Sequence, residues 1–279
     1  MLGRKRPFRR VLIPVALAAI TPLLANCDRD KPAPVEPAPE AVAPTPAPTP
    51  LQPTAPLSRA DLLAAVSRAA SAYAAGQAGE GADPLVGRNF AIRTPFGCTG
   101  PASATGVEDG LAAWSWGPDQ KTIQLSLTPG GWLNTALIAG AGDGDWESVE
   151  GVWLPRPWLT TDACPSIRTD ALQSGAPAPS PQTVGLAAIS ETTDSRAGRR
   201  NGRAYTFTIR GEDDRPPAAP AGGYRTLLEG RIAAFPGGRA VRCRASSPDQ
   251  RPVCIVAIRL DRVAFTEANG NVLTEWRAG

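Results

Sequence analysis

A proline-rich stretch divides the chain and limits where a folded domain can lie. Residues 28–56 contain ten Pro and six Ala. Such a stretch has too little apolar surface to build a core, and repeated Pro favours extended polyproline II backbone. We therefore expect a disordered Pro/Ala-rich linker here, roughly 80–90 Å long at about 3.1 Å per residue, with a folded region only after it.

The residues before the linker have the organisation of a secretory signal peptide. Residues 1–10 hold five basic side chains and no acidic one, and the almost entirely apolar run 11–25 follows. This run is shorter than the roughly 20 residues of a membrane-spanning helix, and it contains Pro14 and Pro22. The pattern predicts a signal peptide over 1–26 that is removed by cleavage.

The cleavage site resembles the lipobox of bacterial lipoproteins, in which Leu, a small residue and Gly, Ala or Ser precede a Cys. Here Leu24, Ala25 and Asn26 precede Cys27, so Asn26 departs from the pattern. The resemblance implies cleavage before Cys27, lipidation of its thiol and acyl chains such as palmitate, two or more of which make a lasting anchor. It places the protein in the periplasm, and Asp28 slightly favours the inner membrane. An ordinary secretory signal and an uncleaved anchor are the alternatives.

The charge of the mature chain gives no indication of a nucleic-acid partner. The whole chain carries a net charge of +3, but removal of the five basic residues of the leader leaves 24 Lys and Arg against 26 Asp and Glu. The chain also has no His and only three Lys. Ser-His and Cys-His catalysis and imidazole metal sites are therefore excluded, and we expect no cofactor and no enzymatic activity.

Residues 57–80 carry the signals of one α-helix. Ser58 and Asp61 have the spacing of a capping box, while Leu57 and Leu62 have that of a hydrophobic staple. Leu62, Val66, Ala69 and Tyr73 recur at helical spacing, and Gly76 and Gly79 follow. The pattern predicts a helix over 58–75 that packs on the domain behind it.

Residues 85–279 show the alternation of β-strands. In 121–127, for example, Ile123, Leu125 and Leu127 share one face. The candidate strands are 89–93, 111–116, 121–127, 149–154, 184–189, 204–209, 224–235, 238–244, 253–263 and 272–276. Short strands with Gly- and Pro-rich turns predict an all-β sandwich or barrel. A Pro-rich gap near 175–182 leaves open whether the region is one unit or two.

Two turns can be assigned on residue type. Asn201-Gly202 has the composition of a hairpin turn before the strand 204–209, and 269–271 joins the last two candidate strands in the same way. Both segments are expected to connect strands that pair with each other.

Four cysteines remain in the β-rich region, an even number typical of disulfides in an exported protein. They are Cys98, Cys164, Cys243 and Cys254, which allow three pairings. We favour Cys243–Cys254, because these residues lie on consecutive candidate strands, and this choice leaves Cys98–Cys164. A zinc site is the alternative, but it lacks the usual closely spaced Cys pair.

Six of the seven Trp lie between residues 114 and 158. Flat indole faces stack on sugar rings or hold peptides, so a cluster of exposed Trp marks a binding surface. The candidate binding residues are Trp114, Trp116, Trp132 and Trp146. The alternative is that these side chains belong to the core.

The densest group of acids lies at 143–150. Asp143, Asp145 and Glu147 are a candidate Ca²⁺ site, and a pair drawn from these residues and Glu150 is a candidate glycosidase pair. A solvated loop is the third interpretation. The sequence as a whole predicts a lipid-anchored cell-envelope protein with a non-catalytic binding or assembly role toward envelope proteins or glycans. A glycan-directed hydrolase using the 143–150 loop is the alternative.

Overall fold

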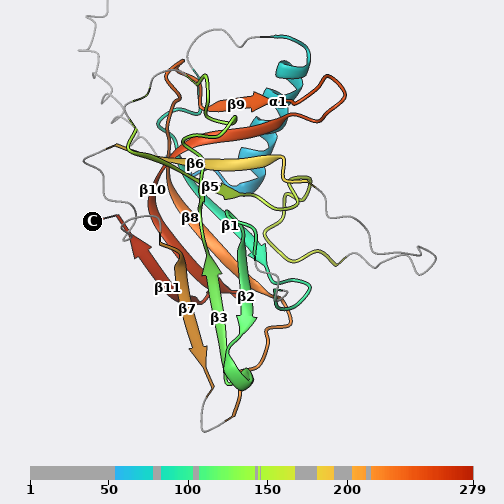
Figure 1. Ribbon diagram of the computed structural model, residues 1–279, viewed down its shortest axis with the longest axis vertical. Coiled ribbons are helices and arrows are strands. Elements are labelled where there is room, and N and C mark those ends of the chain that lie inside the picture. The colour runs from blue at the N-terminus through green and yellow to red at the C-terminus, as the bar shows by residue number, and fades with distance from the viewer. Residues whose placement is uncertain are drawn as a thin grey trace, which may run out of the picture. The chain divides into compact units, whose positions relative to one another are not determined.

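The computed structural model describes residues 54–77, 83–102, 107–141, 144, 146–166, 181–191, 203–211 and 215–278. The predicted signal peptide, Cys27, the linker up to residue 53 and the turn 201–202 lie outside these residues. Residues 52–279 form one compact unit of two β-sheets and one helix (Figure 1). The all-β prediction is thereby confirmed.

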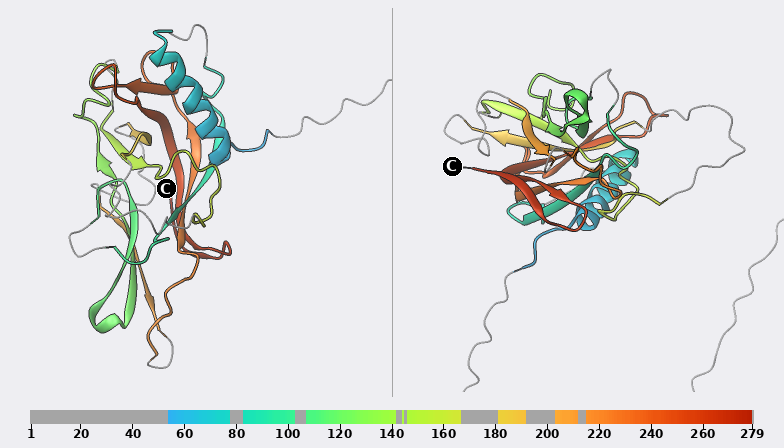
Figure 2. Two further views of the ribbon diagram at one scale, coloured as in Figure 1. Left: turned by 90° about the vertical axis from the view of Figure 1, so that its right-hand side faces the viewer. Right: turned by 90° about the horizontal axis from the view of Figure 1, so that it is seen from below.

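The only α-helix of the described residues is α1 (Arg59–Ala74). Ser58 and Asp61 form the predicted capping box, and Gly76 follows the helix with a left-handed φ of +66°. The staple residues Leu57 and Leu62 are both buried. Helix α1 packs against β1, β9 and β10 of the larger sheet (Figure 2), as the sequence predicted.

The larger sheet has eight strands and the smaller sheet three. The main path of the larger sheet is β1 (Asn89–Phe96), β8 (Tyr224–Ile232), β10 (Val253–Glu267), β6 (Val184–Ser190), β5 (Ser148–Trp153) and β4 (Gly130–Gly131). Strands β9 (Val241–Arg244) and β11 (Val272–Arg277) also pair with β10. The smaller sheet is β2 (Ala112–Trp116), β3 (Thr122–Leu127) and β7 (Tyr205–Arg210), with the 3₁₀ turn η1 (Pro118–Gln120) before β3.

Strand β10 organises the larger sheet because its two halves pair with different strands. The first half pairs with β6 and β9, and the second half pairs with β8 and β11. A β-bulge in its pairing with β8 lies between Leu260 and Arg262. The inserted residue reverses the side-chain alternation, so that Val256 and Ile258 before it and Val263 after it all enter the same core.

The two sheets and α1 share one hydrophobic core. It includes Leu62 of α1, Leu125 of the smaller sheet and Leu228 of the larger sheet. A second core cluster is built around Trp132, Val149 and Ile255.

Strand pairing corrects one expectation from the sequence and answers one question that the sequence left open. Strand β7 pairs with β3 of the smaller sheet and not with β6, its predecessor in the chain. The expectation that the strands on either side of 201–202 pair with each other is therefore wrong, whereas the turn at 269–271 does join β10 to its antiparallel partner β11. Strands β5 and β6, which flank the proposed seam near 175–182, are direct neighbours in one sheet, so the β-rich residues form one unit and not two.

The disulfides are those that the sequence favoured. Cys243 and Cys254 lie opposite each other on antiparallel β9 and β10, with their Cα atoms 4.0 Å apart. Cys98 is bonded to Cys164. Within the residues that the structure describes, no helix has the length and apolar character needed to cross a bilayer.

Candidate functional site

The site that we consider is a groove beside α1, which we call the helix groove. Its volume is about 340 Å³, at the small end of the range of small-molecule sites, about 300–1,000 Å³. One wall is a face of α1, and the other carries Trp158. The lining residues are Leu63, Val66, Ser67, Ala70, Ser71, Ala74, Pro157, Trp158, Thr183, Val184, Arg251, Pro252 and Cys254.

Trp158 has the most exposed large hydrophobic side chain among the described residues, at 55% of its full area. It lies on the segment 155–164 after β5, which we call the Trp158 loop. A single exposed apolar side chain is common on protein surfaces, but an exposed indole that borders a groove adds a flat aromatic contact area to that groove. The side chain therefore marks the helix groove as a surface that is suited to a ligand.

Arg59, in the first turn of α1, holds one end of the Trp158 loop. Its guanidinium donates hydrogen bonds to the carbonyl oxygens of Pro155 at 2.8 Å, Leu159 at 3.1 Å and Arg156 at 3.3 Å. These carbonyls lie on both sides of Trp158, so one buried side chain fixes the backbone that presents the indole.

Arg59 is a buried side chain that keeps its positive charge. The side chain is only 4% exposed, and this burial, with a smaller contribution from the nearby charge of Arg156, lowers its pKa to about 10. That value keeps the guanidinium protonated at neutral pH. Its remaining hydrogen bond goes to the Thr94 hydroxyl, and the nearby charge of Asp162 acts in the opposite sense and raises the pKa.

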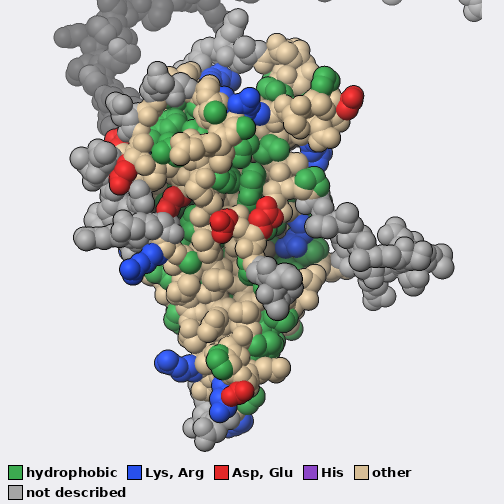
Figure 3. Space-filling view, in the orientation of Figure 1, with side chains coloured by type: hydrophobic (Ala, Val, Ile, Leu, Met, Phe, Trp, Pro, Cys, Tyr) green, Lys and Arg blue, Asp and Glu red, His purple; other side chains and the backbone are tan. Residues whose placement is uncertain are grey.

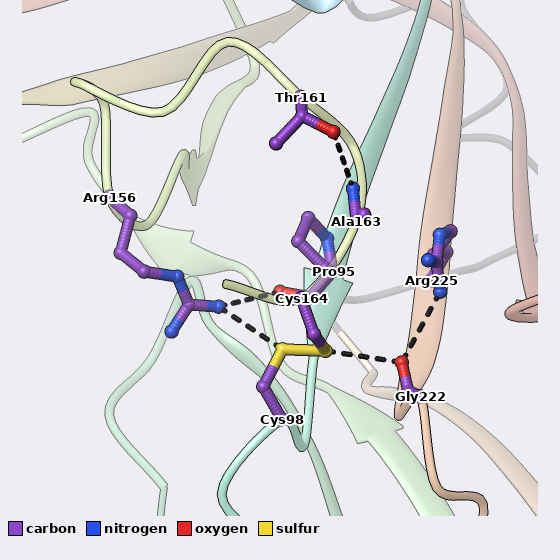
Figure 4. Close-up of a disulfide and its surroundings, with 8 residues drawn as sticks. All are labelled: Pro95, Cys98, Arg156, Thr161, Ala163, Cys164, Gly222 and Arg225. Atoms are coloured by element: carbon purple, nitrogen blue, oxygen red, sulfur yellow. Dashed lines mark hydrogen bonds between the residues drawn. A yellow bond between two sulfur atoms is a disulfide. The ribbon is translucent and has the colours of Figure 1, made fainter. Parts of the chain in front are cut away.

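The other end of the Trp158 loop is held by a disulfide (Figure 4). Cys164 in the loop is bonded to Cys98, just after β1, and its sulfur lies 3.1 Å from the Gly222 carbonyl oxygen. Arg156 donates from Nη2 to the Pro95 carbonyl at 3.2 Å and reaches the Cys98 sulfur at 3.5 Å. The Trp158 loop is therefore anchored on α1, on β1 and on the segment before β8.

Arg156 also has an uncommon backbone conformation, with φ at +52°. A positive φ in a residue other than Gly persists only where its surroundings enforce it, and such residues are frequent at binding sites. Here the surroundings are the contacts of Arg59 and of the disulfide. The indole is thus displayed by a loop whose shape is set before any ligand arrives.

The polar groups of the helix groove are few. Ser67, Ser71 and Thr183 contribute hydroxyls, and the Ser71 hydroxyl already donates to the Ser67 carbonyl at 3.0 Å. Among the described residues that line the groove, Arg251 is the only charged one. It is exposed and has no hydrogen-bond or ion-pair partner in the described part of the chain.

The Trp residues that the sequence singled out for binding form no joint surface. Trp114 and Trp132 are buried, at 3% and 5% exposure, which corrects their assignment as binding residues. Trp116 is half-buried and lies edge-on to Trp114 with ring centroids 5.3 Å apart, and half-buried Trp146 packs edge-on to Phe235. These indoles act in the core, which was the alternative interpretation.

The acidic group is only partly described. Asp143 and Asp145 lie outside the described residues, while Glu147 is exposed and Glu150 is half-buried on β5. Within the described ranges, no three His, Cys, Asp or Glu side chains gather closely enough to hold a metal ion. On the face shown in Figure 3, acidic and basic side chains are interspersed over the surface.

Sequence reasoning did not select Trp158, although it counted this residue in the Trp cluster. One signal was available, because Trp158 follows Pro157 in a segment without strand alternation. Arg59 gave no signal, since it acts through contacts with residues distant in the chain. Arg251 gave none either, since only the folded chain brings it to the groove lining. The chain matches no family model, no curated protein and no solved structure.

Proposed function

We propose that this is a lipid-anchored protein of the bacterial cell envelope that binds a ligand without catalysis, and that the helix groove is its binding site. The observation that carries the binding role is the 55% exposed indole of Trp158 on an anchored loop beside a groove. Binding energy in such sites is concentrated in a few aromatic and Arg side chains. The chain has both types here, in Trp158 and Arg251.

The lipid anchor is supported by the leader and by the redox chemistry of the folded unit. The lipobox-like Leu24-Ala25-Asn26-Cys27 follows a basic and then an apolar segment. All four cysteines of the folded unit are in disulfides, which persist in the periplasm and are rare in the reducing cytosol. The linker 28–56 then serves as a spacer between the acylated Cys27 and the folded unit.

The anchor is tested by fractionation of cells that produce the full-length chain. We expect the unchanged protein to sediment with membranes and Cys27→Ser to appear in the soluble fraction. Mass spectrometry should find the unchanged protein beginning at an acylated Cys27. Membrane sedimentation of Cys27→Ser, or a bare thiol at that position, would contradict the anchor.

The binding role is tested by photo-crosslinking in the same cells. A photoreactive residue replaces Ser71, which is exposed in the helix groove, or Thr208, which is exposed on β7 outside it. We expect an adduct at position 71 that is absent at position 208 and is lost when Trp158→Ala is added. Equal labelling at both positions, or an adduct that is indifferent to Trp158, would contradict the assignment of the groove.

A further inference from the structure

We infer that the helix groove binds a carboxylated saccharide, with the sugar ring on the indole of Trp158 and the carboxylate paired with Arg251. This inference rests on the proposed binding role and names its ligand class. Three properties of the groove support it. Trp158 presents an exposed aromatic face, hydroxyls lie along apolar walls, and Arg251, the one cation among the described lining residues, has no partner in the described part of the chain.

The aromatic face suits a pyranose ring. One side of such a ring presents C–H groups, which pack on a flat indole, while its hydroxyls point outward toward polar partners. The backbone of the Trp158 loop is held by the Arg59 hydrogen bonds at one end and by the Cys98–Cys164 disulfide at the other. Stacking on a side chain whose loop is already ordered avoids the entropic cost of ordering that loop.

The walls favour a sugar over an acyl chain. Ser67 and Thr183 place hydroxyls in the groove that have no hydrogen-bond partner among the described residues. An acyl chain would cover these groups without replacing their hydrogen bonds to water, which is unfavourable. A sugar offers both donors and acceptors to them, while Leu63, Val66 and Val184 supply the apolar contacts.

Charge complementarity decides in favour of an acidic sugar. Arg251 is the only charged residue among those described in the groove lining, and no described carboxylate neutralises it. The planar guanidinium matches the two oxygens of a carboxylate. The backbone that carries Arg251 is held in place. Pro252 and the start of β10 follow it, and Cys254 on β10 is bonded to Cys243 on β9.

The inference is tested by isothermal titration calorimetry on the mature lipidated chain in detergent. The first probe is the disaccharide of N-acetylglucosamine and N-acetylmuramic acid, whose lactyl group is a carboxylate. The second is N,N′-diacetylchitobiose, a neutral disaccharide of similar size. We expect the acidic disaccharide to bind about tenfold more tightly or better, as one charge-assisted hydrogen-bonded pair provides.

A third probe, a disaccharide of glucuronic acid and glucose, distinguishes the two classes of glycan that carry a sugar carboxylate. Tighter binding of the muramic-acid probe indicates the cell-wall glycan, and tighter binding of the uronic-acid probe indicates an acidic polysaccharide. Tighter binding of a glucose phosphate than of both acids would overturn the carboxylate assignment.

Two variants test separately the contact of the carboxylate with Arg251 and the contact of the sugar ring with Trp158. We expect Arg251→Gln to abolish the preference for the acidic disaccharide with little change in the binding of the neutral one, and Trp158→Ala to weaken both by about tenfold. Both side chains are exposed, so folding is preserved, and circular dichroism verifies this. Arg93→Gln, at an exposed position of β1 outside the groove, is the matched control and leaves binding unchanged.

Different experimental outcomes would contradict the saccharide inference and the proposed binding role. If neither acidic disaccharide binds, or if Arg251→Gln keeps the preference, the saccharide inference is wrong. A Trp158-dependent adduct at position 71 would then still support a binding role for the groove with another ligand, such as a peptide. If that adduct is also absent, the binding role itself is wrong.

Discussion

The indole of Trp132 lies flat against Gly151 of β5, so closely that a Cβ atom on Gly151 would come within 1.8 Å of the ring. The same indole covers Gly185 on the neighbouring strand β6 and packs on Trp153, with ring centroids 4.6 Å apart. The absence of a side chain on two adjacent strands is therefore what lets a large aromatic ring close the second core cluster.

Gly151→Ala is expected to lower the free energy of unfolding by about 3 kcal/mol, because the new methyl group displaces a buried ring. Urea unfolding of the variant measures the change. Gly131→Ala on the neighbouring β4 is the matched control, since a Cβ there meets no atom within 4 Å, and a change of under about 0.5 kcal/mol is expected. Similar losses in the two variants would show that the indole does not depend on Gly151.

Arg59→Leu is expected to release the Trp158 loop. It removes the donors to the part-buried Pro155 and Leu159 carbonyls, and each lost hydrogen bond costs about 1 kcal/mol. Limited proteolysis should cut the variant within 155–164 faster than the unchanged protein. Arg68→Leu, at an exposed position of the same helix, serves as the control, and equal cleavage in both variants would contradict the role of Arg59.

The capping box of α1 is expected to weaken in acid. Hydrogen bonds from the side chain and backbone of Ser58 hold the pKa of Asp61 below its usual range, which is about 3.9 in an unfolded chain. The stabilisation is therefore present above that value and is lost as the pH falls through the lower folded pKa. In an NMR titration, Ser58→Ala should raise the Asp61 pKa toward the usual range; an unchanged value would exclude the hydroxyl as its cause.

The two disulfides are expected to differ in their effect on stability. Loop-closure entropy for sequence separations of 66 and 11 residues gives about 4 and about 3 kcal/mol, respectively. Replacing Cys98 and Cys164 together with Ser should therefore cost more than replacing Cys243 and Cys254. Chemical unfolding of the two double variants compares them, and thiol titration of the denatured, unreduced mature protein should find no free thiol. A larger loss from the Cys243–Cys254 pair would contradict the entropic ordering.

Most of the elements could be predicted because their signals are local. The capping box at Ser58 and Asp61 and the alternation in β3 involve residues close together in the chain, and both appear where they were expected. The pairing of β7 was not predictable in this way. Its partner β3 lies about 80 residues earlier, and the choice between β3 and β6 depends on which faces become buried together.

The amino-acid order of this chain was sufficient for the helix, for most of the strands, for the all-β class and for the disulfide partners, because periodicity, capping and Cys spacing act over short distances. It was not sufficient for the site. Trp158 is exposed while Trp114 and Trp132 are buried, although all three belong to one Trp-rich stretch. Burial is decided by contacts across the folded chain, such as those from Arg59 to residues about a hundred positions away, and no local pattern encodes them.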